Sequence, residues 1–416
     1  MSVAKWVAGL AMTLLAVTAA RAQDAAQLMH VPAVRAALEA AKAAEPQTIE
    51  TQIHVCEIPA PSFMETKRGE ELARLFREEG LQNVRTDPAG NVLGDRPGKS
   101  AHPHLVVAAH LDTVFPQGTD VTVKREGAVL RGPGIGDDCR GLAVMLSVIH
   151  ALNQAKVETN GTVTFVADAG EEGLGDLRGM KELFNKTMKG QIDEFVSIEP
   201  GDPGRITTGG VGSYRYRITF KGPGGHSYGA FGIANPIHAL GRAIAKISDF
   251  EVPSSPKTTF NVGRIGGGTS VNSIAFEAWA EVDLRSEESA PLETLNAKFK
   301  QAVNSALEEE NNRWHDRGKL TLSLEQVGYR PAGRTDPSSA IVRTAFAVNQ
   351  ALGLPEPTLD ASSSDSNVPM HLGIPAITIG GGGYDQGAHS PEESFEPRDS
   401  WVGTQRALLL TVALTQ

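Results

Sequence analysis

The sequence predicts an α/β protein in which helices flank a largely parallel central sheet, with a second, α+β domain inserted into the chain. Two observations lead to this prediction. Short apolar runs bounded by polar residues or glycines alternate with helical patterns. From residue 211 to 328 the pattern changes, and the alternation returns after Pro331. The length of 416 residues is sufficient for two or three domains.

Four apolar runs are expected to form the central sheet, because nearly continuous apolar character is typical of strands buried on both faces. They are residues 105–109, 163–167, 195–198 and 376–379. Residues 65–80 predict an amphipathic helix that ends at Gly80, and residues 141–152 predict an apolar helix packed on the sheet. The alanine-rich residues 23–50 predict one or two leading helices.

The insert follows the order β-α-β-β-α-β, which is the ferredoxin-like pattern. Its predicted strands are residues 214–220, 258–265, 274–284 and 320–326, and its predicted helices are residues 235–247 and 291–310. We therefore expect one domain made of residues 23–210 and 329–416, and a second made of residues 211–328.

The first 22 residues have the pattern of a secretory signal peptide. Lys5 supplies the positive charge, residues 6–19 are almost wholly apolar, and Ala20-Arg21-Ala22 fits a cleavage site. The apolar run is shorter than the ~20 residues of a spanning helix, which argues against an uncleaved anchor. We expect cleavage near Gln23, no stable membrane anchor afterwards, and a periplasmic or secreted protein.

Charge and cysteine content exclude several classes of function. Loss of Lys5 and Arg21 with the signal peptide changes the net charge from −10 to −12, and an acidic chain is unsuited to nucleic acid. The only cysteines, Cys56 and Cys139, are too few for a disulfide framework. We expect Cys139 to be a free thiol without a catalytic role, because the neighbouring carboxylates oppose a low thiol pKa.

Acidic and histidine side chains stand at the ends of the predicted sheet strands. In open α/β sheets, ligands bind beyond the carboxyl ends of the strands. The candidates are His110 and Asp112 after the first run, Glu171 and Glu172 after the second, Glu199 after the third, and His389 beyond the fourth. Imidazole and carboxylate groups are suitable ligands for zinc, and paired metals share such sites.

A glycine-rich turn, residues 132–138, adds Asp137 and Asp138. Its glycines allow the sharp bend that brings a carboxylate toward a buried point. A phosphate cradle is the alternative for such a turn before a helix, but two aspartates at the helix start would repel phosphate.

These stretches together resemble the zinc exopeptidase family that includes carboxypeptidase G, aminoacylase, tripeptidase T and succinyl-diaminopimelate desuccinylase. The resemblance covers residues 58–397, in the family's order. It is carried by His110-Leu-Asp112-Thr-Val, Gly134-Ile-Gly-Asp137-Asp138, Gly170-Glu171-Glu172-Gly173, Ser197-Ile-Glu199-Pro and Ala388-His389-Ser390. Cys139 departs from the family, which usually has Lys or Met there.

The resemblance implies a role for each of these residues. Two Zn²⁺ per subunit would be bound, with Co²⁺ or Mn²⁺ as alternatives. Asp137 would bridge the metals, with His110 and Glu199 on one and Glu172 and His389 on the other. Asp112 would fix the tautomer of His110 by a hydrogen bond. Glu171 would be the general base on a metal-bridging water and then protonate the leaving amine.

The resemblance also implies that the insert is a lid and dimerisation domain. His226, in the loop Gly222-Pro-Gly-Gly-His226-Ser, would stabilise the oxyanion, often across the interface of a homodimer. Asn272 and Arg285 resemble residues that hold the carbonyl and carboxylate of the substrate. A plain surface role remains the alternative for His226 and for Arg285. Residues 362–365 and 380–383 match loops that line the family's site.

The predicted function is hydrolysis of an amide bond in small peptides or N-acyl amino acids. Glu rather than Asp at position 199 resembles the carboxypeptidase and aminoacylase branch, and an aminopeptidase of the tripeptidase type is the alternative. A non-catalytic metal- or peptide-binding protein would be expected to lack the base or a ligand, yet each is present. A redox or phosphoryl-transfer metalloenzyme would need a nucleotide pocket, of which the sequence gives no sign. No Gly-x-Ser-x-Gly elbow indicates a serine hydrolase.

Overall fold

The structure is a computed structural model that describes residues 25–416, so the predicted signal peptide lies outside the described residues. The chain divides into two compact units. The catalytic unit contains the residues up to Gly210 together with Arg334–Gln416, and the insert is Val211–Gly333. Among the described residues, no helix combines the length and apolar character needed to cross a membrane.

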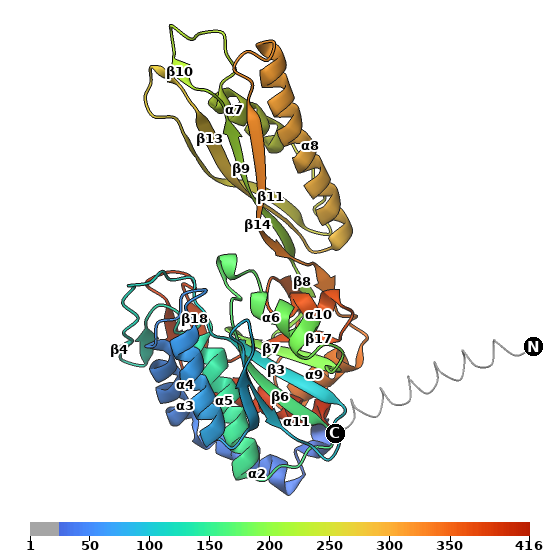
Figure 1. Ribbon diagram of the computed structural model, residues 1–416. Coiled ribbons are helices and arrows are strands. Elements are labelled where there is room, and N and C mark those ends of the chain that lie inside the picture. Colours follow the sequence, from blue (N-terminus) through green and yellow to red (C-terminus); the bar gives the residue numbers. More distant parts are fainter. Residues whose placement is uncertain (1–24) are drawn as a thin grey trace, which may run out of the picture. The chain divides into compact units, whose positions relative to one another are not determined.

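A nine-stranded sheet forms the centre of the catalytic unit (Figure 1), in the order β1-β2-β6-β3-β7-β17-β8-β15 with β16 beside β8. Strands β6, β3, β7 and β17 run parallel to their neighbours within this group. The strands are β1 (Gln82–Thr86), β2 (Val92–Arg96), β3 (His104–His110), β6 (Thr162–Asp168), β7 (Glu194–Glu199), β8 (Ile206–Gly210), β15 (Gly333–Arg334), β16 (Leu359–Ser362) and β17 (Ala376–Gly380). The predicted α/β class with a largely parallel sheet is confirmed.

Helices cover both faces of this sheet, because alternate residues of its strands are apolar on both sides. Val107 and Ile198 face one core with α2 (Pro32–Ala43), α4 (Thr66–Glu78), α5 (Cys139–Gln154), α9 (Ala340–Ala351) and α11 (Trp401–Leu414). Val106 and Phe195 face the other core with α6 (Arg178–Glu182), the turn of π-helix that follows it (Leu183–Thr187), and α10 (Asn367–His371).

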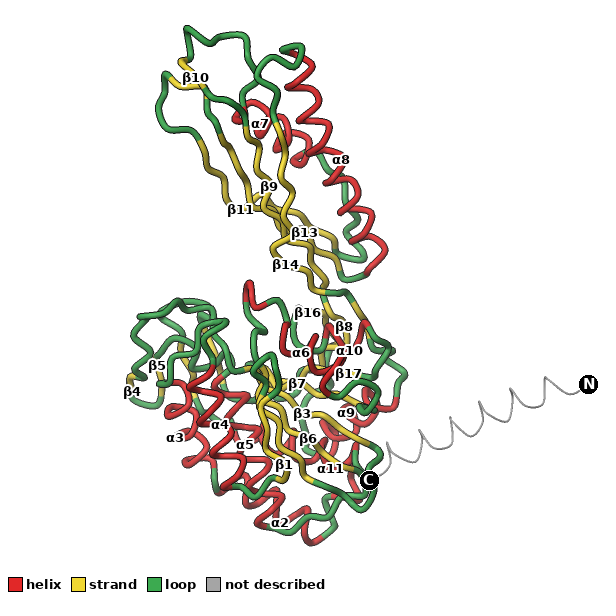
Figure 2. Tube along the Cα trace, in the orientation of Figure 1, coloured by secondary structure: helices red, strands yellow, loops and turns green. Residues whose placement is uncertain are grey.

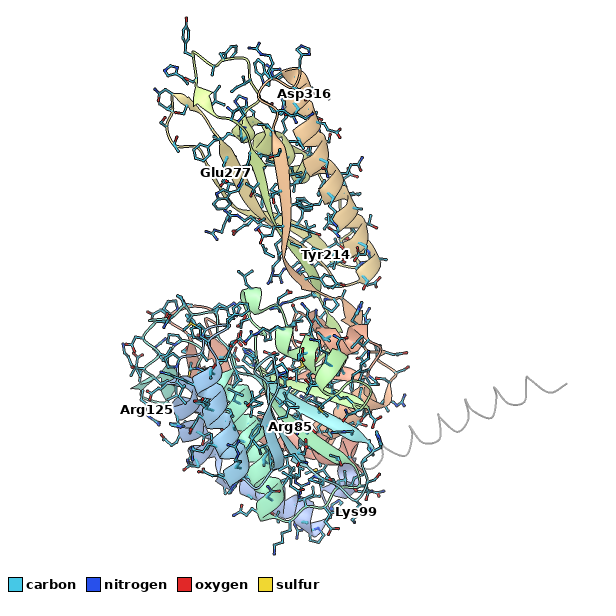
Figure 3. The ribbon with its side chains drawn as sticks, viewed as in Figure 1. Arg85, Lys99, Arg125, Tyr214, Glu277 and Asp316 are labelled. Atoms are coloured by element: carbon cyan, nitrogen blue, oxygen red, sulfur yellow. The ribbon has the colours of Figure 1, made fainter. Side chains whose placement is uncertain are left out.

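Short elements complete the catalytic unit. Helix α3 (Glu45–Cys56) packs on α5, and a single 3₁₀ turn spans Gly173–Gly175. A small antiparallel sheet has the order β18-β19-β5-β4, formed by β4 (Lys124–Glu126), β5 (Val129–Arg131), β18 (Tyr384–Gln386) and β19 (Ser394–Glu396). Lys99 and Arg125 project from the outside of this unit (Figure 3). They form ion pairs with Glu158 and Glu50, respectively.

The insert is an antiparallel sheet with two helices on one face. The sheet order is β11-β13-β9-β14, as the ferredoxin-like prediction requires. The elements (Figure 2) are β9 (Gly212–Lys221), β10 (Gly225–His226), α7 (Pro236–Ser248), β11 (Thr258–Gly267), β12 (Ser273–Ile274), β13 (Glu277–Ser286), α8 (Ser289–Arg313) and β14 (Thr321–Arg330). The insert ends at Gly333 rather than at residue 328, because β14 continues to Arg330.

The two faces of the insert's sheet differ in chemistry because the side chains of each strand alternate. Ile218, Phe220 and Val282 face α7 and α8 in the core of the insert. On the opposite face, Arg215 lies opposite Asp283 and Arg217 lies opposite Glu281, with ion pairs of 3.2 and 2.7 Å. Tyr214, labelled in Figure 3, lies in the insert. Its hydroxyl donates to Glu293 of α8 at 2.6 Å.

Candidate metal centre

The carboxyl ends of the parallel strands bring the predicted ligands together. His110 is the last residue of β3, Glu199 is the last of β7, and Glu171 and Glu172 follow β6. Strand β3 lies between β6 and β7, so these three ends meet at one edge of the sheet. The alternation of strands and helices thus places imidazole and carboxylate groups at a common point.

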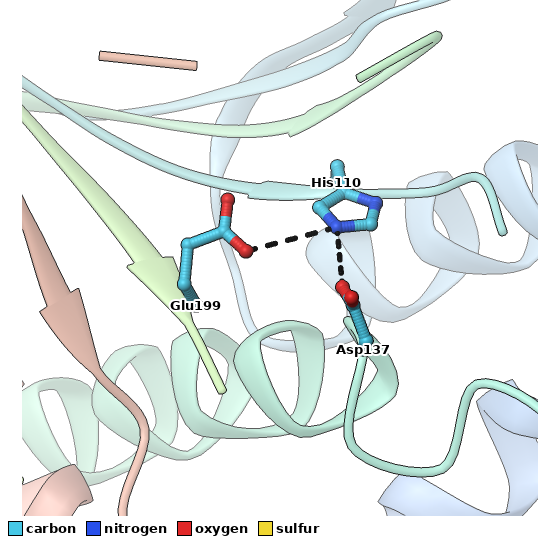
Figure 4. Close-up of side chains that lie close together, drawn as sticks. All are labelled: His110, Asp137 and Glu199. Carbon is cyan, nitrogen blue, oxygen red and sulfur yellow. Dashed lines mark hydrogen bonds and ion pairs between the residues drawn. The ribbon is translucent and has the colours of Figure 1, made fainter. Parts of the chain in front are cut away.

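Asp137 approaches this edge from the loop that connects β5 to α5. Its Oδ1 atom lies 2.9 Å from Nε2 of His110, and Oε2 of Glu199 lies 3.9 Å from the same nitrogen (Figure 4). His110, Asp137 and Glu199 each offer one ligand atom, and these atoms lie within 4.8 Å of one another. Gly134 has a φ of 79°, which lets this loop turn toward the sheet.

The second carboxylate oxygen of Asp137 belongs to another ligand set. Oδ2 of Asp137 lies 3.3 Å from Nε2 of His389, and that nitrogen lies 2.9 Å from Oε1 of Glu172. Asp137, Glu172 and His389 again place ligand atoms within 4.8 Å of one another. One carboxylate therefore joins two groups of ligand atoms, and together they contain all five predicted ligands.

The electrostatics of the cluster favour a bound cation. Burial raises the pKa of Glu199 well above its usual value. The charge of His110 lowers this pKa, whereas the carboxylates of Glu171 and Asp137 raise it further. Hydrogen bonds to Asp137 and Glu172 raise the pKa of His389 to about 10. Oε1 of Glu199 is buried and has no hydrogen-bond partner among the described residues. Two imidazoles face an excess of carboxylates, so the donor set fits divalent metal ions.

Asp112 contacts the site through both its backbone carbonyl and its carboxylate. Nδ1 of His110 is 2.9 Å from the backbone carbonyl of Asp112, whereas the Asp112 carboxylate is 3.7 Å away. The hydrogen bond to His110 that would fix its tautomer is thus made by the backbone carbonyl of Asp112. The carboxylate instead accepts the backbone N–H groups of Gly170, Glu171 and Glu172 at 3.0, 2.9 and 3.1 Å. It thereby positions the turn that carries both glutamates.

Glu393 is a positioning residue that the sequence did not reveal. Its carboxylate accepts the backbone N–H groups of Gly134, Gly136 and Asp137 at 2.9, 2.8 and 2.9 Å. Burial raises the pKa of Glu393 to about 7 against the opposing effect of these donors. Its contact with the Asp137 loop spans more than 250 positions, and the only sequence signal was its closeness to His389.

We expect Glu393→Gln to weaken both the fold and the metal centre. The amide keeps one acceptor oxygen but turns an NH₂ group toward a buried N–H, which costs about 1–3 kcal/mol. Metal affinity should fall by about 10–100-fold, as for other partners that orient a ligand. Denaturant melts and chelator competition measure these losses. The adjacent, exposed Glu392→Gln is the control, and equal behaviour of the two variants would contradict this role.

Two further acids lie behind the cluster. Asp138, the N-cap of α5, accepts from the backbone N–H groups of Gly141 at 3.0 Å and His110 at 3.2 Å. Asp365, in the serine-rich loop expected to line the site, is fully buried. Burial raises the pKa of Asp365 well above its usual value, with repulsion from Asp168 and Glu171 adding to it. The site is therefore supported by a shell of buried carboxyl groups.

The insert places its candidate residues in two separate locations. His226 on β10 pairs with Ser273 on β12, and Ser227 donates its backbone N–H to the carbonyl of Asn272 at 2.9 Å. His226 and Asn272 are both exposed. Arg285 lies near the far end of β13, where its Nε donates to Asp283 at 2.7 Å. The structure thus brings His226 and Asn272 together but leaves Arg285 apart from them.

The fold and the site together define a metal-dependent hydrolase: an α/β domain gathers imidazoles and carboxylates at the carboxyl edge of its sheet, beside the further carboxylate of Glu171. Residues 106–412 match the model of peptidase family M20/M25/M40, and the chain belongs to this family. It is a metallopeptidase or amidohydrolase, as the sequence predicted.

The relatives include a dipeptidase and a succinyl-diaminopimelate desuccinylase. Identity to the cytosol non-specific dipeptidase of Escherichia coli (strain K12) is 23% over 376 residues, covering 79% of this chain and 73% of that protein. Identity to a succinyl-diaminopimelate desuccinylase of Xanthomonas oryzae pv. oryzae (strain PXO99A) is 28% over 311 residues, covering 68% and 76%.

Solved structures share the fold over most of the chain. A tripeptidase from Staphylococcus aureus (subsp. aureus Mu50) superimposes with a TM-score of 0.74 at 23% identity, covering 89% of this chain and 98% of that one. The YXEP protein of Bacillus subtilis, described as a dinuclear metal binding peptidase from the M20 family, gives a TM-score of 0.66 at 18% identity and covers 90% and 99%.

Proposed function

We propose that this protein is a dinuclear zinc-dependent hydrolase of amide bonds in small peptides or N-acyl amino acids. The observation that carries the proposal is the position of Asp137, whose two carboxylate oxygens face two different histidines. His110 and Glu199 would complete one metal site, and Glu172 and His389 the other. When bound, the two ions polarise the scissile carbonyl and lower the pKa of the attacking water.

Glu171 would act as the general base and then as the general acid of the reaction. It is buried, it lies in the turn held by Asp112, and its neighbour Glu172 faces His389. A carboxylate in this place would take a proton from the attacking water and deliver it to the leaving amine. A protein that only binds metal or peptide would have no need of this acid, which favours catalysis.

The substrate branch can be decided by one screen. Glu199 supports the carboxypeptidase and aminoacylase branch, and an aminopeptidase of the tripeptidase type is the alternative. We expect hydrolysis of dipeptides and N-acyl amino acids that have a free C-terminal carboxylate, and strong loss of turnover when this group is amidated. Undiminished hydrolysis of amidated tripeptides with a free N-terminus would instead support the aminopeptidase.

Removal of metal should abolish the activity reversibly. A chelator at neutral pH is expected to reduce hydrolysis to background, because the polarised carbonyl and the activated water both depend on the ions. Elemental analysis should find close to two equivalents of metal per chain before treatment, and added Zn²⁺, Co²⁺ or Mn²⁺ should restore turnover to different extents. Full activity in metal-free protein would contradict the proposal.

The insert would act as a lid and as the interface of a homodimer. Its exposed large apolar side chains include Tyr228, Phe231 and Phe276, with exposed fractions of 88%, 74% and 57%. They follow or flank His226 and Asn272 in the sequence, and β11 presents a free sheet edge. His226 would then stabilise the oxyanion, and Asn272 and Arg285 would hold the substrate.

We expect His226→Ala to lower kcat by about 10²–10³-fold, the usual loss for one oxyanion donor, with both metals retained. Metal analysis and steady-state kinetics measure this. His238→Ala, which removes another exposed histidine of the insert, should leave kcat unchanged. Loss of metal from His226→Ala would place this residue among the ligands instead. A stable monomer of full activity, seen by light scattering, would contradict a role across the interface.

Export is the remaining part of the proposal. The signal-like pattern of the first 22 residues supports a periplasmic or secreted enzyme. Expression of the full chain in a bacterium with an outer membrane should give a processed protein in the periplasmic fraction, with Gln23 at or near its N-terminus. An unprocessed cytoplasmic chain would contradict it.

A further inference from the structure

Cys56 and Cys139 lie side by side in the catalytic unit, although 83 positions separate them in the sequence. Cys56 is the last residue of α3 and Cys139 is the first of α5. Both are free cysteines with 0% exposure, and their thiols are in hydrogen-bonding contact with each other. The sequence alone gave no reason to pair them.

The surroundings of the two thiols are apolar and tightly closed. Leu130, Ile135 and Phe395 form a small core with them, separate from the two cores of the central sheet. The thiol of Cys56 also donates to the carbonyl oxygen of Pro133, 3.5 Å from its Sγ. Beside this core, the buried Arg68 donates from Nη2 to the backbone carbonyl of Cys56 at 3.1 Å.

The end of α3 is fastened at this point to the loop that carries Asp137. Gln52, one turn before Cys56, donates from Nε2 to the carbonyl of Ile135 at 2.7 Å. The contact of Cys56 with Pro133 lies just before it in the same loop. Cys139 continues from this loop into α5, so the thiol pair closes a ring of contacts around residues 133–139.

We propose that Cys56 and Cys139 are a disulfide site, which cross-links α3 to the start of α5 when the chain folds in an oxidising compartment. The proposal is independent of the substrate and of the reaction. It differs from the free thiol expected for Cys139 from the sequence, because the structure places both cysteines in one small core with their thiols in contact. Closing a loop of this length removes conformational freedom from the unfolded chain and stabilises the folded one.

The oxidant is a small disulfide, such as oxidised glutathione. One cysteine thiolate attacks a sulfur of the oxidant, and one glutathione thiol leaves. The second cysteine then attacks the mixed disulfide, the bond between the two protein sulfurs forms, and the second glutathione thiol leaves. The two thiols lose two protons and two electrons, and the electrons reduce the sulfur–sulfur bond of the oxidant. The exchange takes place during folding, before the apolar cluster closes over both sulfurs.

The test is refolding of the full chain in a buffer of reduced and oxidised glutathione, followed by thiol titration in denaturant. We expect no titratable thiol, and a non-reducing peptide map that joins the peptides of Cys56 and Cys139. The oxidised protein should melt about 5–10 °C above the same protein treated with reductant. This measurement requires no variant, so a folding defect cannot obscure it.

Cys56→Ser and Cys139→Ser are the matched controls, and neither should show a shift of melting temperature between oxidant and reductant. Because the cross-link would hold the Asp137 loop, the oxidised protein should also lose metal to a chelator several-fold more slowly than the reduced one. Two titratable thiols after refolding, or a glutathione adduct on each cysteine, would overturn the proposal. Equal rates of metal loss from the oxidised and reduced proteins would show that the disulfide does not hold the loop that carries Asp137.

Discussion

Glu171→Gln is expected to lower kcat by about 10²–10⁴-fold while both metals stay bound. The amide has nearly the shape of the carboxylate but cannot accept the proton of the attacking water. The turn should keep its geometry, because Asp112 accepts the backbone N–H of Glu171, which the substitution leaves in place. Steady-state kinetics, elemental analysis and a thermal melt on the same preparation separate loss of chemistry from loss of metal or fold.

The neighbouring residue supplies a matched comparison. Glu172→Gln should lose metal, because the carboxylate of Glu172 faces His389 in the second ligand set. Glu158→Gln, at an exposed position on the same unit, should change neither metal content nor kcat. Glu171 also belongs to a group with His110 and Glu172 whose ligand atoms lie within 4.8 Å of one another. Metal loss from Glu171→Gln would therefore show that it is a ligand, and unchanged turnover would exclude it as the base.

The sequence predicted the parts of this fold that depend on local patterns. The strands ending at His110 and Glu199 are continuous apolar runs followed by a ligand-type residue, so their burial and their position at the sheet edge follow from one pattern. The small sheet of β18, β19, β5 and β4 was not predicted. Its strands have only three residues each, and β4 is exposed along its length, so no periodic signal exists.

Contacts between distant segments were beyond the reach of sequence patterns. Glu393 contacts the Asp137 loop, and Cys56 contacts Cys139, only because the chain returns to the same place after many residues. The sequence predicted a hydrogen bond between Asp112 and His110, but it did not tell whether the carbonyl or the carboxylate of Asp112 makes it. The meeting of the candidate ligands was easier to predict, since His110 and Glu199 end strands, Glu172 follows one, and Asp137 lies in a glycine-rich turn.

Asp137→Asn is expected to have the second-largest effect on activity. It should act by weakening metal binding, whereas Glu171→Gln acts by preventing proton transfer. One carboxylate oxygen of Asp137 faces His110, and the other faces His389. An amide offers one neutral oxygen to one side and an NH₂ group, which repels a cation, to the other. Replacing a partner that merely orients a ligand costs about 10–100-fold in metal affinity, so loss of a shared ligand should exceed 100-fold.

The expected protein binds at most one metal ion. Because metal affinity falls by more than about 100-fold, we expect substrate hydrolysis at less than about 1% of the normal rate. Chelator competition and elemental analysis measure the first, and kinetics with added Zn²⁺ measure the second. Asp120→Asn, which removes the same charge from an exposed loop nearby, is the control and should retain both metals. Two tightly bound metals in Asp137→Asn would show that the two ligand sets do not share this carboxylate. Loss of one metal with full activity would instead show that hydrolysis needs a single ion, because the ion that remains would then be sufficient for catalysis.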